Sequence, residues 1–454
     1  MEITSTQTES ALTPQQRRVM VASVSGTVIE WFDFALYSVA AGLIIGPLFF
    51  SGLDATGQML AAFATFAVGF FVRPLGGIAL AHLGDVKGRK YALMVTIALM
   101  GIGTGGMGLL PTYDSIGILA PILLVVCRLI QGLGAGAELG SAMVIIIESA
   151  PKNRRGYLSS YSFLAAGLGA AMAFGVFLLL SAMPNDVLMA WAWRLPFLAS
   201  GVLVLLALWI RRKLDESPEF KAAAAELAKR GTARRVPFIQ VFRHNSREFV
   251  SGVFAVAAHN VVSYVLLTFS VAYVVQAGVD RTSFLVVLFV GSLAGAIATP
   301  MWGRLSDRVG PRPLLTAGYV VIGVLAFPLL MSFTSGNIWL TAGLVFLTYV
   351  FGVALEQGGQ ALYLGRLYPA EYRVTGVTAT REVNSVLFAG PTPYVAAWLT
   401  TLAGGAAWPV AVFLVIIVVF SIVGVYTARF TGEAVVTAQT DTTGKRAAEA
   451  SDPR

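Results

Sequence analysis

The chain has 454 residues, 56% of them hydrophobic and only 12% charged, and it carries a formal net charge of +8. Soluble domains average roughly 25% charged residues, so this composition excludes a soluble globular protein and predicts a polytopic membrane protein built from helices. The basic residues lie between apolar runs, which excludes nucleic acid as their partner and indicates membrane topology instead.

Twelve apolar runs follow a polar start, and runs of about 17 or more residues predict membrane-spanning helices. The first run is too long for the apolar core of a signal peptide, so we expect no cleaved leader. The runs cover approximately 20–48, 58–82, 91–110, 117–146, 157–182, 193–211, 249–276, 282–303, 312–333, 337–363, 375–402 and 406–429.

The distribution of Lys and Arg sets the expected orientation. Every second connection is rich in these residues, whereas the intervening connections, apart from Arg281, are nearly free of them. The positive-inside rule therefore places both termini in the cytoplasm. We expect a cytoplasmic N-terminal tail, an N-terminal six-helix half, a cytoplasmic central loop, a C-terminal six-helix half and a cytoplasmic C-terminal tail, at residues 1–18, 19–211, 212–248, 249–429 and 430–454.

Two features recur at a similar offset in the two halves. Asp85 and Asp307, 222 positions apart, are each followed three residues later by Gly and shortly afterwards by Arg. Pro151 and Pro369, 218 positions apart, each precede an Arg by four residues. Similar offsets indicate two homologous halves in parallel repeat, a transporter plan in which the substrate site lies between the halves near the midplane.

Several motifs resemble known families. Asp-x-x-Gly-Arg-Lys at 85–90 and Arg-x-x-Gln-Gly at 128–132 resemble motifs of the major facilitator superfamily. The whole chain resembles the metabolite:proton symporter family within it, which includes carriers of shikimate, 2-oxoglutarate, citrate and proline/betaine. Span ten ends in Arg-Leu-Tyr-Pro at 366–369, where that family usually has Glu-Leu-Phe-Pro. The segments that carry the finer resemblance are 30–34, 73–77, 84–85, 136–138, 193–197 and 216–220.

Two carboxylates lie inside the first apolar run, where an acidic group costs about 2.5–3.5 kcal/mol and usually serves a substrate or ion path. Glu30 and Asp33 share a helix face, and Tyr37 extends that face by one turn. Asp33 lies near the middle of its span and is the stronger candidate for proton or substrate binding. The alternative for Glu30 is a permanent ion pair with Arg128 or Arg73.

Other polar residues inside the first-half and seventh spans extend the candidate site. Glu138 is a further candidate carboxylate in span four. Arg128 has the fork geometry that holds a carboxylate bidentately, whereas the superfamily resemblance implies a packing and charge-relay role. The resemblance also implies that Asn260 and Tyr264 line the cavity. His259 beside them is either a titrating group or a packed histidine.

Spans ten and eleven carry the remaining candidates. Glu356 and Gln360 share one face of span ten, and Arg381 and Asn384 share one face of span eleven. Arg381 either receives an anionic substrate or is neutralised by Glu356 or Glu382. The sequence leaves both interpretations open.

The superfamily resemblance also implies a cytoplasmic gate. Its residues are Asp85 and Arg89 in the first half and Asp307 and Arg308 in the second. Arg73, near the cytoplasmic end of span two, is either a gate-pairing arginine or one whose charge snorkels to the membrane surface.

The expected function is transport rather than catalysis. No Walker-type loop is present, so ATP is not the expected energy source, and the scattered histidines and single cysteine predict no metal site. We expect no enzyme activity and no cofactor.

We expect a monomeric carrier in the inner or plasma membrane whose proton gradient drives import of a small polar metabolite, namely an organic acid such as shikimate or a dicarboxylate. Protonation of Asp33 or Glu138 is expected to be coupled to anion binding at Arg381 or Arg128. The alternatives are a betaine or proline:proton symporter, a drug-efflux antiporter and, from another class, a transport-like sensor or channel.

Overall fold

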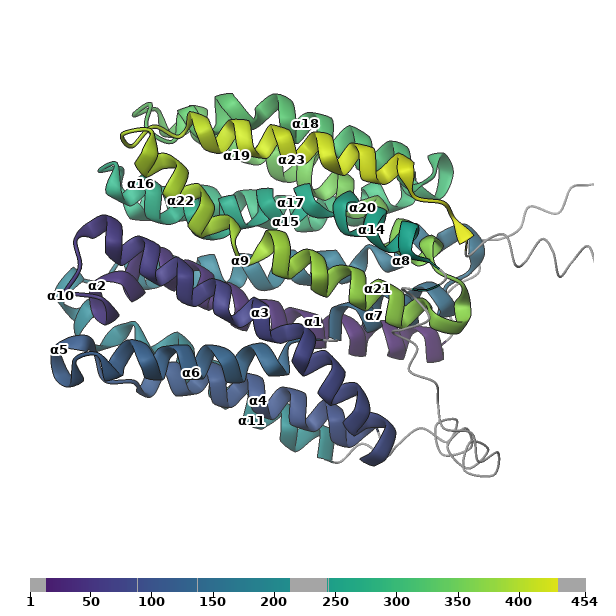
Figure 1. Cartoon of the computed structure of the whole chain (residues 1–454), viewed down its shortest axis with the longest axis horizontal. Helices are drawn as coiled ribbons and strands as arrows, with labels where there is room; N and C mark the ends of the chain where they lie inside the picture. The colour runs from purple at the N-terminus through teal and green to yellow at the C-terminus, as the bar shows by residue number, and fades with distance from the viewer. Residues whose placement is uncertain (1–13, 88, 137, 213–242, 244, 432–454) are drawn as a thin grey trace, which may run out of the picture.

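The computed structural model describes residues 14–87, 89–136, 138–212, 243 and 245–431. Within these ranges the chain forms helices and no strand. Residues 1–13 and 432–454 of the predicted tails and nearly all of the central loop lie outside the described residues, whereas residues 14–18, predicted as tail, begin the helix α1. In Figure 1 the helices of the N-terminal half, purple to blue-teal, form mostly one side of an elongated bundle, and those of the C-terminal half, teal-green to yellow, form mostly the other.

The N-terminal half has six helical spans, and several of them are interrupted. Spans one to three are α1 with η1 and α2, then α3, then α4; spans four to six are α6 with α7, α8 with α9, and α11. The elements are α1 (Pro14–Ala40), the π-helical η1 (Ala41–Ile45), α2 (Gly46–Phe49), α3 (Ala55–Lys87), α4 (Arg89–Leu109), α5 (Tyr113–Ile116), α6 (Leu119–Gly134), α7 (Glu138–Ser149), the 3₁₀ turn η2 (Lys152–Arg154), α8 (Arg155–Ser159), α9 (Tyr161–Ser181), α10 (Asn185–Val187), the π-helical η3 (Leu188–Ala192) and α11 (Arg194–Arg212).

The C-terminal half repeats this arrangement. Span seven runs from α14 to α16, spans eight and nine are α17 and α18, span ten runs from α19 to α20, span eleven from α21 to α22, and span twelve is α23. The elements are α14 (Ser246–Ala255), α15 (Ala257–Tyr264), the π-helical η4 (Val265–Phe269), α16 (Ser270–Gln276), α17 (Arg281–Val309), α18 (Pro311–Ser332), α19 (Ile338–Leu347), the π-helical η5 (Thr348–Val353), α20 (Ala354–Leu367), the 3₁₀ turn η6 (Ala370–Tyr372), α21 (Arg373–Asn384), the π-helical η7 (Ser385–Ala389), α22 (Thr392–Leu402) and α23 (Trp408–Thr427).

These helical spans coincide with the twelve predicted apolar runs. Eight of the described helical segments are each long and apolar enough to cross a membrane, and Met94–Leu109 and Leu119–Gly134 are shorter apolar helices. Spans one, seven, ten and eleven contain a π-helical stretch, and the π-helical η3 directly precedes span six. Such stretches are rare in proteins and occur frequently at functional sites.

The sequence repeat has a counterpart in local structure. The 3₁₀ turns η2 and η6 lie 218 positions apart, and each leads directly into the helix that begins span five or span eleven. Arg154, the last residue of η2, has φ −133° and ψ 15°, and Tyr372, the last of η6, has φ −134° and ψ 20°. The two halves therefore share the same backbone route into these spans.

Glycines set the distance between spans two and four. A Cβ atom added at Gly76 would lie 2.1 Å from the carbonyl oxygen of Leu133, and one added at Gly132 would lie 2.2 Å from that of Gly69. Small residues allow membrane helices to approach this closely, and van der Waals packing then stabilises the contact. This crossing holds Arg73 and Arg128, on α3 and α6, in fixed relation to each other.

We expect Gly76→Ala to destabilise the fold strongly, because its methyl group would overlap the backbone of α6. Overpacking of this kind costs about 3 kcal/mol or more when backbone must move. Gly343→Ala is the matched control, since a Cβ at Gly343 has no neighbour within 4 Å. Thermal unfolding in detergent, followed by intrinsic fluorescence, measures both variants. Equal melting temperatures for the two would contradict the tight crossing.

Candidate functional site

A cavity of about 60 Å³ lies between the two halves. The N-terminal half contributes Trp31 from α1 and Phe163 from α9, and the C-terminal half contributes His259 from α15, Tyr349 from η5 and Gln357 from α20. Mostly apolar and aromatic walls with a few polar groups are typical of small-molecule sites. The sequence analysis did not select Trp31 or Phe163, because aromatic residues inside apolar runs carry no distinguishing pattern.

The halves contact each other at the end of the bundle that carries α8 and the start of α21. The carboxylate of Asp307 on α17 accepts hydrogen bonds from the backbone N–H groups of Gly156 (2.6 Å) and Tyr157 (2.9 Å) on α8. Arg373 on α21 pairs with Glu148 on α7 at 3.2 Å. Asp307 thus lies at a contact between the halves, and its gate role stays a prediction.

The other expected gate residues have different positions. Arg308 is exposed. The side chains of Asp85 and Arg89 lie outside the described part of the structure, although their backbones belong to α3 and α4.

The halves also meet at the opposite end. A Cβ at Gly42 in η1 would lie 3.1 Å from the carbonyl oxygen of Thr268 in η4, so these two segments are in close contact. Near the surface, Arg281 donates a hydrogen bond of 3.5 Å to the side-chain oxygen of Asn185. The cavity therefore has contacts between the halves on both sides of it along the bundle.

Arg73 connects the two halves near the cavity. Its guanidinium group is 3.2 Å from the carboxylate of Glu382 on α21 and 3.9 Å from that of Glu30 on α1. It also lies over the rings of Phe34 and Phe70, 5.3 and 5.5 Å from their centroids. Arg73 is thus an interface residue rather than one whose charge reaches the membrane surface, and Glu30 pairs with Arg73 rather than with Arg128.

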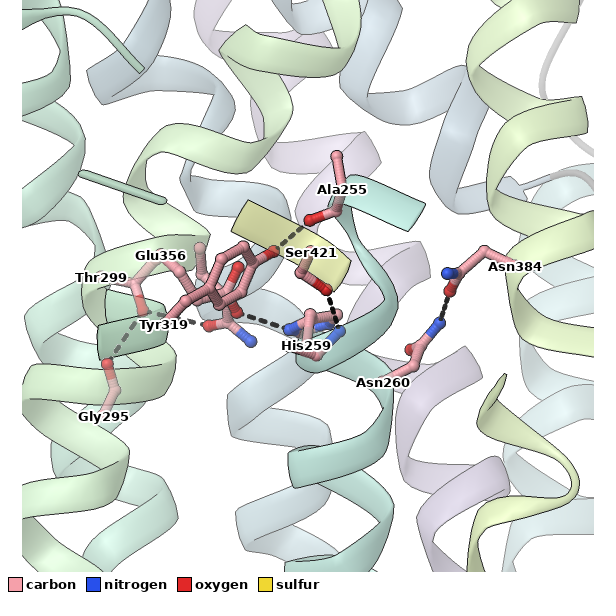
Figure 2. Close-up of polar contacts among 11 residues, drawn as sticks. Ala255, His259, Asn260, Gly295, Thr299, Tyr319, Glu356, Asn384 and Ser421 are labelled. Atoms are coloured by element: carbon pink, nitrogen blue, oxygen red, sulfur yellow. Dashed lines mark hydrogen bonds and ion pairs between the residues drawn. The ribbon is translucent and has the colours of Figure 1, made fainter. Parts of the chain in front are cut away.

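His259, a residue of the cavity wall, forms a buried pair with Glu356 (Figure 2). His259 Nδ1 lies 2.6 Å from Glu356 Oε1, and the ring of His259 packs edge-on against Phe163 with 5.6 Å between centroids. Glu356 is fully buried, and so is Gln360 one turn further along α20. The side-chain N and O atoms of Gln360 have no hydrogen-bond partner among the described residues.

Asn260, Asn384 and Tyr264 connect other spans. The side-chain amide of Asn260 donates to that of Asn384, as Figure 2 shows, and Asn384 donates to the carbonyl oxygen of Val253 at 2.6 Å. The ring of Tyr264 packs against Phe66 and Phe70 of the other half, 5.4 and 5.5 Å between centroids. The two asparagines therefore join spans seven and eleven, and Tyr264 crosses the interface.

Among the described residues, no carboxylate lies within ion-pair distance of Arg381. Its guanidinium carbon lies 5.8 Å from the centroid of Phe163, a residue of the cavity wall. Of the two carboxylates expected to neutralise it, Glu356 pairs with His259 and Glu382 pairs with Arg73. The side chain is only partly buried, so its donors remain accessible from within the protein.

Asp33 lies inside the N-terminal half. Its fully buried carboxylate accepts a hydrogen bond from Ser200 on α11, and its second oxygen has no partner among the described residues. It is not a cavity-lining residue. The side chain of Glu138, the other expected carboxylate of this half, lies outside the described part of the structure.

Arg128 is fully buried and satisfied within the N-terminal half. It donates to the carbonyl oxygen of Phe66 at 2.8 Å and to the side chain of Gln131, and it lies 4.0 Å from the centroid of the Tyr37 ring. Tyr37 in turn forms a hydrogen bond of 2.6 Å with Thr65. Arg128 therefore braces spans one, two and four against each other, and no carboxylate of a described side chain lies within ion-pair distance of it.

Among the described residues, no group of three or more His, Cys, Asp or Glu side chains is arranged to hold a metal ion.

Comparison with known protein families and curated proteins gives extended matches. A family model described as Major Facilitator Superfamily matches residues 23–391. The shikimate transporter of Escherichia coli (strain K12) is 36% identical over 402 residues, which cover 88% of this chain and 91% of that protein. The proline/betaine transporter of the same organism is 34% identical over 417 residues, which cover 90% of this chain and 83% of that protein.

Solved structures match over similar lengths. A crystal structure of a D-xylose-proton symporter matches with a TM-score of 0.69 at 18% sequence identity. The match covers 89% of this chain and 96% of the symporter chain. A partially occluded inward-open conformation of the xylose transporter XylE from E. coli has a TM-score of 0.68 at 16% identity, with 91% and 97% covered. At this identity the likeness concerns the fold, and the predicted architecture of twelve helices in two six-helix halves is confirmed.

The two buried arginines should respond differently to mutation. Arg128→Gln removes hydrogen bonds to Phe66 and Gln131, and buried polar groups left without partners cost about 1–3 kcal/mol each. Arg381→Gln removes no hydrogen bond to a described residue and should change stability by less than about 1 kcal/mol. Melting temperatures of the purified variants in detergent test the contrast. An equally large loss of stability in Arg381→Gln would contradict it.

Proposed function

This chain belongs to the Major Facilitator Superfamily, and we propose that it imports a small organic anion together with protons by alternating access. In this mechanism the two six-helix halves rock around a site at their interface and expose it to one side of the membrane at a time. The cavity between Trp31, Phe163 and His259 is the proposed substrate site. No covalent chemistry is involved, so the chain is a carrier and not an enzyme.

One observation carries the anion assignment. Arg381 is a partly buried cation beside the cavity wall, and each carboxylate expected to neutralise it has another partner. A cation held at membrane depth without a close counter-ion is costly, and such residues usually mark a substrate or ion path. The carboxylate of an organic acid would supply the missing charge and accept the two parallel hydrogen bonds that a guanidinium group offers.

The proton is assigned to Asp33. Its carboxylate is fully buried, has a hydroxyl group as its hydrogen-bond partner and has no cation within ion-pair distance among the described residues. A carboxylate charge at this depth without a counter-ion is destabilising, and uptake of a proton neutralises that charge. Asp33 lies apart from the cavity, so its coupling to the substrate runs through the packing of α1 against α11 and α9.

The proposed location is the inner membrane of a bacterial cell, with both termini in the cytoplasm. The proposal rests on the bacterial origin of the relatives and on the alternation of Lys- and Arg-rich connections along the sequence. With this orientation the contacts made by Asp307, Glu148 and Arg373 lie at the cytoplasmic end, and the contact at Gly42 lies at the opposite end. We propose that the functional unit is the monomer.

A second substrate class is favoured by the cavity wall itself. Trp31, Phe163 and Tyr349 place three aromatic rings around the cavity, and aromatic faces attract quaternary ammonium groups. A betaine carries both such a group and a carboxylate that Arg381 could bind. The names of the relatives include both shikimate and proline/betaine, so both classes belong in the transport assay.

The anion site is tested by uptake into proteoliposomes. An imposed gradient, acidic outside, should accelerate uptake of at least one compound among shikimate, dicarboxylates, betaine and proline. Arg381→Gln should reduce that uptake by more than about tenfold, and Arg381→Lys should keep part of it, because an ammonium group offers a charge without the planar fork. Arg429→Gln is the control, since Arg429 is exposed near the end of span twelve. If the gradient accelerates none of these compounds, proton symport is wrong.

The proton site is tested by separating accumulation from exchange. Asp33→Asn keeps a side-chain oxygen that can accept the hydrogen bond from Ser200 but cannot take up a proton. We expect this variant to lose uphill accumulation and to retain exchange of labelled for unlabelled substrate across the membrane. Ser200→Ala retains the carboxylate and should still accumulate substrate. Full uphill accumulation by Asp33→Asn would show that another residue carries the proton.

A further inference from the structure

Arg73 lies between two carboxylates that belong to different halves. Its Nε atom is 3.2 Å from Oε2 of Glu382 on α21, and its Nη2 atom is 3.9 Å from Oε1 of Glu30 on α1. Nη2 also donates to the carbonyl oxygen of Ala135 at 3.0 Å. Arg73, Glu30 and Ala135 all belong to the N-terminal half. A rigid movement of the halves therefore keeps these contacts and breaks only the contact with Glu382.

Glu382 is also the sequence neighbour of Arg381. Consecutive residues on a helix do not face each other, so Glu382 is poorly placed to form a close ion pair with Arg381. Its charge is nevertheless within electrostatic reach of the Arg381 guanidinium group, together with those of Arg73 and Glu30. Among the described residues, Arg73 is the one cation within ion-pair distance of Glu382, so Glu382 loses its close counter-ion when Arg73 moves away.

We propose that Glu382 expels the bound anion when the halves separate at the Arg73–Glu382 contact. The proposal rests on the proposed function, because it requires the substrate carboxylate at Arg381. While the halves are together, Arg73 neutralises Glu382 and Arg381 attracts the anion. Once Arg73 moves away, Glu382 places an unbalanced negative charge next to the anion. Like charges in a poorly hydrated interior are weakly screened, so the negative charge of Glu382 then repels the bound anion.

Other contacts between the halves do not have this effect. The ion pair of Glu148 with Arg373 breaks in the same movement, but the Glu148 side chain is 43% exposed. The carboxylate of Asp307 is held by backbone N–H groups of α8. Neither Glu148 nor Asp307 is among the charges that act on Arg381. Glu382 is thus a positioning residue that acts through its charge without touching the anion, and Glu148 offers a matched control.

The test compares binding and release in five variants. Binding of shikimate, and of acetate as the smallest carboxylate, is measured by titration calorimetry on purified full-length protein in detergent. Release is followed as efflux of preloaded shikimate from proteoliposomes. The variants are Arg73→Gln, Glu382→Gln, the double variant Arg73→Gln/Glu382→Gln, Arg381→Gln and Glu148→Gln.

Arg73→Gln should weaken binding by about tenfold or more, because it leaves Glu382 charged in every state. Glu382→Gln should bind about threefold or more tightly than wild type and release more slowly, a split that loss of structure would not produce. The affinity of the double variant should lie within about threefold of that of Glu382→Gln, because without the Glu382 charge the loss of Arg73 has little further effect on binding. Glu148→Gln should bind like wild type.

The outcomes distinguish failure of the anion site at Arg381 from failure of the role proposed for Glu382. If Arg381→Gln binds like wild type, or if wild type binds neither probe, the anion site of the proposed function is refuted and this inference falls with it. If Arg381→Gln abolishes binding while Arg73→Gln leaves it unchanged, the site stands and the role of Glu382 is refuted. If Arg73→Gln does not fold, Glu382→Gln alone decides, since unchanged affinity and unchanged efflux would overturn the proposal.

Discussion

A charge inside a bilayer requires a partner, and the Arg73–Glu382 pair meets this requirement across a boundary that has to open. The pair lies between α3 and α21, and its side chains are only 13% and 11% exposed. Separating Arg73 from Glu382 breaks an ion pair in a poorly hydrated interior. The pair therefore stabilises the arrangement in which the two halves are together. Glu30 gives Arg73 a second counter-ion within its own half. Arg73 therefore keeps a counter-ion when the halves separate, whereas Glu382 loses its ion-pair partner.

The other buried charged groups, unlike Arg73, have their partners within their own half. Arg128 takes all its contacts from spans one, two and four, so it moves with the N-terminal half as part of a rigid unit. The pair of His259 and Glu356 belongs wholly to the C-terminal half. The interface itself is lined by small residues where α9 meets α17. A Cβ at Gly167 would lie 2.8 Å from that of Ala296, so the two helices approach with little side chain between them. Two rigid halves, with few large side chains where α9 meets α17, are compatible with a rocking movement of one half against the other.

The sequence predicted the helices better than the partners of their charged residues. Apolar run length and the repeated Asp and Pro motifs depend on local composition, and the spans follow them closely. The partner of Arg73 is different, because Glu382 lies more than 300 positions away and its selection depends on how two halves dock. From the sequence alone, Arg128 and Arg73 were equally acceptable as the partner of Glu30. The cavity aromatics Trp31 and Phe163 were missed for the same reason, since any apolar span contains rings and only the packing decides which ones face the interface.

The repeat explains why Arg381 meets Phe163. Span eleven follows span five by the same 218 positions that separate the turns η2 and η6, and this offset relates Phe163 to Arg381. Residues at equivalent positions in two parallel halves can touch only near the axis that relates the halves, and in this plan the axis passes through the substrate site. The guanidinium carbon of Arg381 lies 5.8 Å from the Phe163 centroid. At one pair of equivalent positions, then, one half provides an aromatic surface and the other a cation, so the site is chemically asymmetric although its scaffold is repeated. An organic acid, with an apolar body and one charged end, is the kind of ligand that such an asymmetric pair of walls can orient.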